Sequence, residues 1–158
     1  MTRHTITVTA SADIPARAAD IYDIIADYLT GHPRILPPEH FTFLDVDSGG
    51  VGAGTRIRFG MKAFGRVTTR HGTISEPVPG RELRETLDDG LVTTFLVEPR
   101  GSHLTRVTIE TVYQRSGLRW LIERLVVPAF LRRVYDAELD LLSREATGSS
   151  SAASSATR

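Results

Sequence analysis

The first part of the chain changes from a period of two to a helical period. Residues 4–10 alternate, with isoleucine, valine and alanine on one side and threonines on the other, which predicts a half-buried strand. From residue 15 to residue 28 the apolar side chains recur at intervals of three and four, which predicts a helix that buries one face. The prolines among residues 31–38 then leave room for one short helical turn.

Residues 40–115 alternate again, and clusters of Gly, Pro, Asp and Ser interrupt the alternation at short intervals. This pattern predicts a meander of antiparallel strands. In the predicted strand of residues 54–62, Ile57, Phe59 and Met61 share one face and basic residues share the other. One face of the sheet is therefore expected to be buried and the other exposed to solvent. The predicted strands are residues 40–47, 54–62, 65–76, 81–88, 91–98 and 103–114.

The last part of the chain returns to a helical period. It runs from Gly117 to about Ala146, a length of roughly 45 Å at 1.5 Å per residue. Pro128 lies in the middle and predicts a kink. Residues 147–158 are mostly Ser and Ala, which predicts a disordered tail after a folded domain of residues 1–146.

Composition narrows the classes of function. The 158 residues suffice for one domain with a real core. The chain has no cysteine, which excludes disulfides and thiolate metal sites. The formal net charge is zero, so we expect no nucleic-acid partner. No apolar run is long enough for a transmembrane segment, and the alternating start is unlike a secretory signal, so we expect a cytoplasmic protein.

The order of elements predicts an α+β domain whose helices cover one face of an antiparallel sheet. This order, with the helix of residues 14–27, the His-Pro segment of residues 32–37 and the glycine loop of residues 49–55, resembles the SRPBCC or START-like superfamily. Within it the chain looks most like the bacterial polyketide cyclase/dehydrase branch. The resemblance covers about residues 3–145. It implies a helix-grip fold, in which a curved seven-stranded sheet wraps around a long C-terminal helix, with two short helical segments near the N-terminus.

The resemblance also implies a cavity between the sheet and the final helix. The apolar sheet face supports this independently, although the same side chains would also fill a solid core. We expect a small hydrophobic molecule or lipid to be bound there. The expected contact residues are Ile57, Phe59, Met61, Val67, His71, Leu83, Glu85, Val107, Ile109, Tyr113, Leu125 and Ala129.

Three residues are candidates for proton transfer in this cavity. His71 shares its parity with Val67, and a histidine titrates near neutral pH. Glu85 shares its parity with Leu83, so we expect a buried carboxyl that acts as a proton donor or pairs with an arginine such as Arg81. Tyr113 would donate a hydrogen bond to a carbonyl group. Each of the three is also explained without a function: His71 as a hydrogen-bonded wall residue or one turned outward, Glu85 as a carboxylate in water near the mouth, and Tyr113 as a core residue.

Other motifs carry no chemistry. The five histidines lack the spacing of a metal site, so we expect no metal and no cofactor. The glycines of residues 49–54 are followed by a strand rather than a helix, so the loop bends the sheet and does not bind phosphate.

Three functions remain open. The first is a binding module for a hydrophobic molecule or lipid, and the second is a cyclase or dehydratase acting on a polyketide-like substrate. The third is a protein-interaction module, because residues 120–131 carry more apolar side chains than one buried stripe uses. This excess would also serve a homodimer or a contact with a membrane surface.

Overall fold

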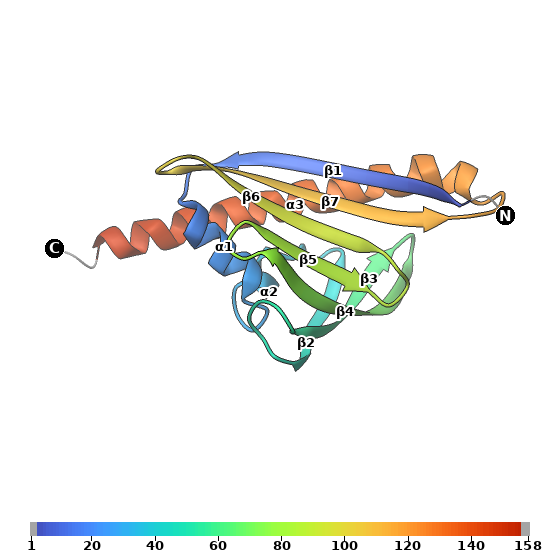
Figure 1. Ribbon diagram of the computed structural model, residues 1–158, viewed down its shortest axis with the longest axis horizontal. Helices are drawn as coiled ribbons and strands as arrows, with labels where there is room; N and C mark the ends of the chain where they lie inside the picture. The colour runs from blue at the N-terminus through green and yellow to red at the C-terminus, as the bar shows by residue number, and fades with distance from the viewer. Residues whose placement is uncertain (1–2, 156–158) are drawn as a thin grey trace.

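A computed structural model of the protein describes residues 3–155, with the side chains of residues 3–148. One curved sheet and one long helix dominate the molecule (Figure 1). The elements are β1 (His4–Ile14), α1 (Ala18–Ala26), α2 (His32–Ile35), β2 (Phe41–Ser48), β3 (Arg56–Ala63), β4 (Arg66–Val78), β5 (Glu82–Leu87), β6 (Val92–Gly101), β7 (Leu104–Arg115) and α3 (Trp120–Ser155). The predicted strands of residues 40–115 are confirmed to within three residues at each end.

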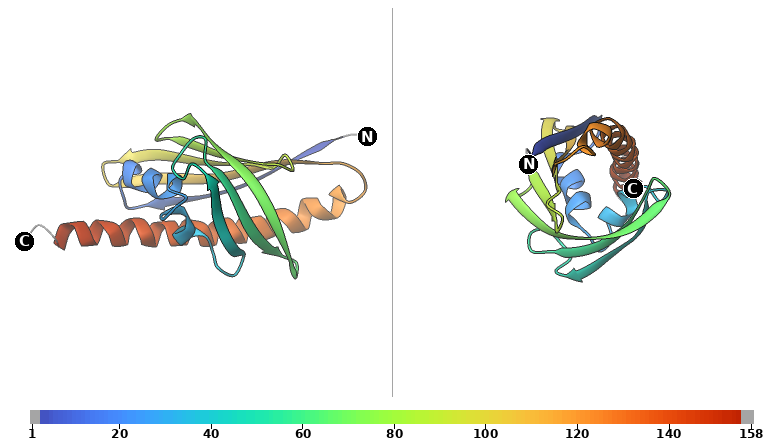
Figure 2. Two further views of the ribbon diagram at one scale, coloured as in Figure 1. Left: turned by 90° about the horizontal axis from the view of Figure 1, so that it is seen from below. Right: turned by 90° about the vertical axis from the view of Figure 1, so that its right-hand side faces the viewer.

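The seven strands form one antiparallel sheet in the order β1-β7-β6-β5-β4-β3-β2. The first strand therefore pairs with the last, and the other strands follow as a meander. Seen end-on, the sheet curls around α1 and α2, and α3 closes its open side (Figure 2). This arrangement confirms the helix-grip fold predicted from the sequence.

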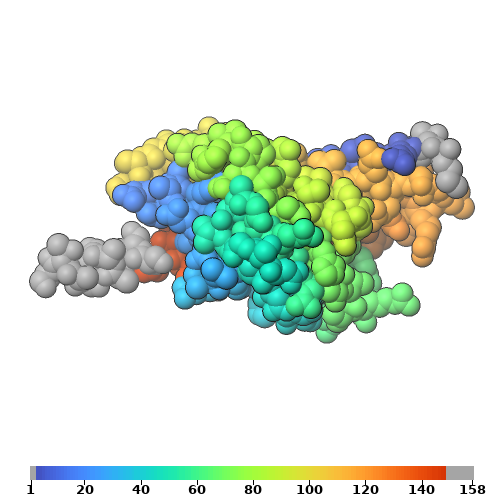
Figure 3. Space-filling model, turned by 60° about the horizontal axis from the view of Figure 1, so that its bottom comes forward, coloured from blue at the N-terminus to red at the C-terminus, as the bar shows by residue number. Residues whose placement is uncertain are grey.

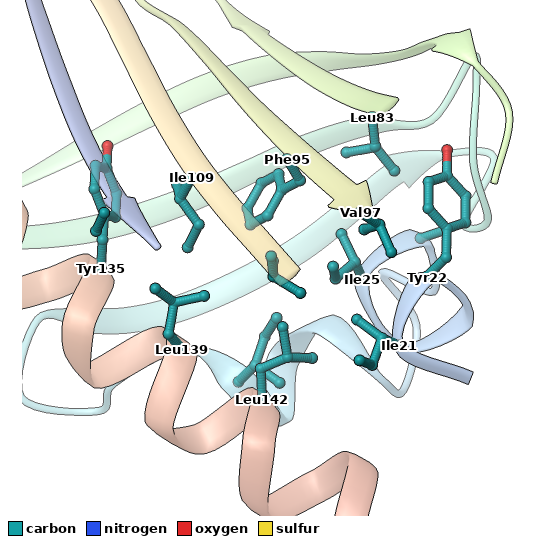
Figure 4. Close-up of a cluster of buried hydrophobic side chains, with 14 of the residues drawn as sticks. Ile21, Tyr22, Ile25, Leu83, Phe95, Val97, Ile109, Tyr135, Leu139 and Leu142 are labelled. Carbon is teal, nitrogen blue, oxygen red and sulfur yellow. The ribbon is translucent and has the colours of Figure 1, made fainter. Parts of the chain in front are cut away.

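The dense core lies where α1 covers the sheet. Ile21 and Ile25 of α1 are one helical turn apart and are fully buried, as expected for the apolar face of an amphipathic helix. They converge with side chains of the sheet and with Leu139 and Leu142 of α3 (Figure 4). This end of the molecule is packed solid, so any open space must lie toward the other end of α3.

The first helix is shorter than the sequence predicts. It begins at Ala18, because Arg17 before it is still extended (φ −71°, ψ 143°). It ends at Ala26, because the glycine loop captures the chain there. Tyr28 N–H donates to the carbonyl of Gly50 over 2.9 Å, and Gly52 N–H donates to the carbonyl of Ala26 over 2.9 Å. The loop therefore fixes the position of Tyr28.

Gly52 offers a test of this loop. Its φ is +66°, and an added Cβ would lie 2.5 Å from Oε2 of Glu76, which accepts a hydrogen bond from Ala53 N–H. We expect Gly52→Ala to lower the free energy of unfolding by about 2–3 kcal/mol in urea denaturation. Gly90→Ala, with φ +85° and open space around it, should cost only about 1–2 kcal/mol. Equal losses would show that the contact with Glu76 contributes nothing.

The final helix α3 continues through Pro128 and runs from Trp120 to Ser155. It therefore extends past the end predicted near Ala146. The disorder predicted for residues 147–158 stays a prediction, and residues 156–158 lie outside the described residues. Within residues 3–155, no helix is both long and apolar enough to cross a membrane.

Candidate ligand-binding cavity

A cavity of about 460 Å³ lies between the concave face of the sheet, α2 and the first half of α3. This volume falls in the usual range for small-molecule sites. Most of its wall is apolar and comes from several strands of the sheet and from α3. Phe59 and Met61 belong to β3, Leu87 and Phe95 to β5 and β6, and Val127 to α3. The side chains of these elements leave the space between them open.

Some of the predicted contact residues line this cavity. They are Ile57, Phe59, Met61, Glu85 and Tyr113. Their inward orientation follows from the alternation of the strands, because Ile57 and Phe59 on β3 and Tyr113 on β7 are buried, and Glu85 lies between buried Leu83 and Leu87 on β5. The apolar face read from the sequence is therefore the face that encloses the cavity.

Three predicted contact residues lie on the same face but outside the cavity wall. Leu83, Val107 and Ile109 are 0% exposed and belong to the dense core beneath α1. The sequence alternation identifies the inner face of a strand. It does not say which part of that face is covered by a helix and which part is left open.

Two predicted contacts on α3 also lie outside the cavity wall. Leu125 is 68% exposed, and Ala129 is exposed as well. The residues of α3 that face the cavity are one position further along, and include Val126 and Phe130. The many apolar residues on this stretch gave more than one plausible stripe, and the sheet packs against a neighbouring one.

The predicted cavity-facing orientation of Val67 and His71 is wrong. Val67 is 57% exposed on the outer face, and His71 lines a shallow outer hollow. The inward positions of β4 at this end are instead Arg66, Thr68 and Arg70. They are polar because they surround the mouth of the cavity, where water reaches them, so the apolar cue assigned the wrong parity to this strand.

A buried polar cluster closes the inner end of the cavity. Oε1 of Glu85 accepts a hydrogen bond of 2.5 Å from the hydroxyl of Tyr28, rather than pairing with Arg81. The Nε2 atom of His32 lies 3.6 Å from the same oxygen. His32 stacks on the ring of Tyr28 at 4.3 Å between centroids. Its Nδ1 is 2.7 Å from the carbonyl of Ile25, and since a carbonyl only accepts, Nδ1 carries a proton.

Burial sets the charge states of two members of this cluster. The pKa of His32 is lowered because burial disfavours the imidazolium, an effect partly opposed by the charge of Glu85. The pKa of Tyr28 is raised well above its ordinary value by burial and then by Glu85. At neutral pH the imidazole is therefore uncharged, and the phenol keeps the proton that it donates to Glu85.

Glu138 of α3 also lines the inner end of the cavity and is 3% exposed. No hydrogen bond or ion pair joins it to another residue in the described part of the chain. Its pKa is raised well above the ordinary value, first by burial and then by the charge of Glu85. The surroundings of Glu138 therefore favour the uncharged carboxylic acid over the carboxylate.

The hydroxyl of Tyr113 is a second polar group without a partner. It is buried, and no hydrogen bond to it is found in residues 3–155. By contrast, the hydroxyl of Tyr135 on the same cavity wall is hydrogen-bonded to Thr111. The cavity thus offers two buried polar groups, the Glu138 carboxyl and the Tyr113 hydroxyl, that the protein itself does not satisfy.

The roles of His32, Tyr28 and Glu138 in the cavity were not predicted from the sequence. A usable signal existed for Glu138, which lies four residues after Val134 and four before Leu142 in an otherwise apolar stripe. A glutamate at such a position is either buried or breaks the stripe. For His32 the signal was weaker, because a short turn between prolines does not reveal which side chain points inward.

The mouth of the cavity is charged at its rim and apolar beyond it. Nε of Arg115 donates to Glu123 over 3.0 Å, and both residues line the opening. The first turns of α3 lie beside the ends of β1 and β7, where His4 stacks on Trp120 (orange in Figure 3). Leu118, just before α3, is 85% exposed, and Ile122 near its start is 70% exposed. Phe64, in the β3–β4 turn, is 64% exposed.

No metal centre is visible in this region. Within residues 3–155, no three His, Asp or Glu side chains gather closely enough to hold a metal ion.

The curled sheet, the long closing helix and the apolar cavity define a helix-grip protein of the START type. A profile of the family described as polyketide cyclase / dehydrase and lipid transport matches residues 5–147. The chain belongs to this family. No curated protein matches the chain.

Solved structures share the fold over nearly the whole chain. The solution structure of KanY protein (ms6282) is 27% identical, with a TM-score of 0.79 over 91% of this chain and 99% of that one. Norcoclaurine synthase from Thalictrum flavum is 16% identical, with a TM-score of 0.74 over 95% and 99%. Zhui aromatase/cyclase from Streptomyces sp. R1128 is 19% identical, with a TM-score of 0.73 over 91% and 94%. The last two likenesses show the fold alone.

Proposed function

We propose that the protein binds a small hydrophobic molecule or lipid in the cavity between the sheet and α3. The observation that carries this proposal is the pairing of an apolar cavity of about 460 Å³ with polar groups that lack partners. Few, convergent polar groups in an apolar pocket are typical of small-molecule sites. A buried polar group without a hydrogen bond costs about 1–3 kcal/mol, so a ligand that satisfies it gains affinity.

The polar groups narrow the class of ligand. The carboxylic acid of Glu138 donates a hydrogen bond, and the hydroxyl of Tyr113 donates or accepts one. A ligand with a hydroxyl or carbonyl group on an apolar body would satisfy them. An anionic group at the inner end is disfavoured, because Glu85 lies there and no cation among the described residues pairs with it.

Filling the cavity tests the proposal. Val127 lines the cavity from α3 and is partly buried. We expect Val127→Trp to weaken binding of the neutral apolar dye N-phenyl-1-naphthylamine by at least about tenfold, or roughly 1.4 kcal/mol, in a fluorescence titration. Leu125→Trp adds the same ring two positions away on an exposed face and should bind the dye as the unmodified protein does. Unchanged binding by Val127→Trp would refute the cavity as the binding site.

A second candidate function is an enzyme of the cyclase or dehydratase type. It is favoured by one observation, that the carboxyl groups of Glu85 and Glu138 face the same cavity. Such chemistry needs a shaped pocket with a proton donor and a proton acceptor. Of the catalytic candidates from the sequence, Glu85 and Tyr113 line the cavity, whereas His71 lies on the outer face.

The interaction surface and the location in the cell stay predictions. The exposed apolar residues just before α3 and at its start, which include Leu118, Leu121 and Ile122, are the surface through which a homodimer would form. Light scattering of the purified protein measures its mass in solution and tests the homodimer directly. A cytoplasmic location likewise remains predicted from the sequence.

A further inference from the structure

Glu85 has the surroundings of a proton acceptor. Its side chain is 13% exposed and reaches the inner end of the cavity from β5. Within residues 3–155 it receives one hydrogen bond, from Tyr28 to Oε1. The His32 Nε2 atom at 3.6 Å is too distant for a second one. The remaining lone pairs of the carboxylate are therefore available to a bound molecule.

Glu138 has the surroundings of a proton donor. It reaches the same inner end from α3, across the cavity from the sheet, and it pairs with no cation in the described part of the chain. The titratable groups around it are Glu85, Tyr28, His32 and Tyr135. None of these side chains offers Glu138 a positively charged partner. The group is thus held in its protonated form by its surroundings.

Two carboxyl groups line the same cavity, but only Glu85 accepts a hydrogen bond, from Tyr28, whereas Glu138 has no such partner in the described part of the chain. Different surroundings of this kind are the usual basis for assigning an acid and a base in an active site. We propose that Glu138 is the proton donor and Glu85 the proton acceptor of a catalytic site for neutral ketones bearing a hydrogen on the adjacent carbon. This inference rests on the proposed binding function, because the ketone must first enter the apolar cavity.

The step is an enolisation. Glu85 removes a proton from the carbon next to the carbonyl, and the electron pair of that C–H bond forms the new C=C bond. The electron pair of the C=O π bond moves to oxygen, which takes the proton of Glu138. The product is the enol, with Glu85 protonated and Glu138 ionised, and the reverse step restores both groups. The ketone must be neutral, because an anion would be repelled by Glu85.

The protonated state of Glu138 is tested without any ligand. We expect the infrared spectrum of the unmodified protein at neutral pH to contain the carbonyl band of a protonated carboxylic acid. This band should disappear in Glu138→Gln and persist in Glu39→Gln, a change at an exposed position outside the cavity. An unmodified protein without the band would overturn the assignment of Glu138 as the acid.

The reaction is tested with 1-tetralone, a bicyclic aromatic ketone, by proton NMR in deuterium oxide. We expect the protein to accelerate deuterium uptake next to the carbonyl. Glu85→Gln should lower this acceleration by at least about 100-fold, the usual contribution of a general base, and Glu138→Leu should lower it as well. Glu85→Gln keeps an oxygen that accepts the Tyr28 hydrogen bond, so the fold is expected to survive, and Glu39→Gln should match the unmodified protein.

Displacement of N-phenyl-1-naphthylamine by the ketone distinguishes failure of the proposed binding function from failure of the proposed enolisation alone. If neither the dye nor the ketone binds, the proposed binding function fails. If the dye binds but the ketone does not displace it, ketones are the wrong substrate class and the inference fails alone. The inference also fails alone if the ketone binds without accelerated deuterium uptake, or if Glu85→Gln retains the full rate.

Discussion

Replacing Glu138 by leucine is expected to raise the free energy of unfolding by about 1–3 kcal/mol at neutral pH. The residue is 3% exposed, and no hydrogen bond or ion pair joins its carboxyl to the described part of the chain, so burial of this polar group destabilises the fold. Leucine has nearly the same size and no polar atoms to desolvate. Urea denaturation followed by circular dichroism measures the difference.

The gain from Glu138→Leu should depend on pH in a defined direction. The folded state holds the proton of Glu138, because its pKa is raised, whereas the unfolded chain releases it near the ordinary value of 4.5. The stabilising effect of this proton is complete below that value and is lost as the pH rises toward the folded-state pKa. The advantage of the leucine variant therefore widens with pH by up to about 1.4 kcal/mol per unit.

Glu138→Gln is the matched control for this pH dependence. Its side chain resembles the protonated acid and cannot ionise, so its stability relative to the leucine variant should be independent of pH. A difference between the unmodified protein and Glu138→Leu that stays flat from pH 4 to pH 8 would contradict a buried, uncharged carboxyl at this position. If Glu138→Leu is more stable than the unmodified protein but no longer binds ligand, Glu138 serves function at the expense of stability.

The largest loss of stability is expected for Phe95→Ala, at about 3–5 kcal/mol. Phe95 is 2% exposed on β6. Its ring meets that of His32 edge-on at 5.7 Å between centroids. It also separates the cavity from the dense core. Truncation therefore removes buried apolar contacts on one side and enlarges an existing space on the other, which the surrounding strands cannot close.

Urea denaturation tests this loss, with Phe64→Ala as the control. Phe64 is 64% exposed in the β3–β4 turn, so its truncation should change stability by less than about 1 kcal/mol. Losses of similar size for the two variants would contradict the role of Phe95 in the core. In Phe95→Ala the enlarged cavity should also accept bulkier ligands than the unmodified protein does.

The fold was predictable because it depends on patterns that repeat over many residues. The alternation of β3, seen in Ile57 and Phe59, and the helical period around Ile21 each summarise several independent positions. Errors were confined to the ends of elements. The first helix stops at Ala26 because of hydrogen bonds to a loop more than twenty residues away, and no local pattern contains that contact.

The site was harder to predict because it depends on single side chains from distant elements. Glu85 was found, since its parity follows from the leucines beside it. Its partners Tyr28 and His32 were not, because they come from the segment after α1, whose path across the sheet has no periodic signal. His71 was misassigned because the inward residues of β4 are polar near the mouth, which reverses the usual link between polarity and exposure.

The two halves of α3 are held very differently. Val134 and Leu142 are almost completely buried, whereas Ile122 and Leu125 are about two-thirds exposed. Lifting the first turns would open a path to the inner cluster and leave the anchored half in place. Substitutions in the first turns of α3 should therefore change the dissociation rate of the proposed ligand. They should change the free energy of unfolding of the protein only slightly.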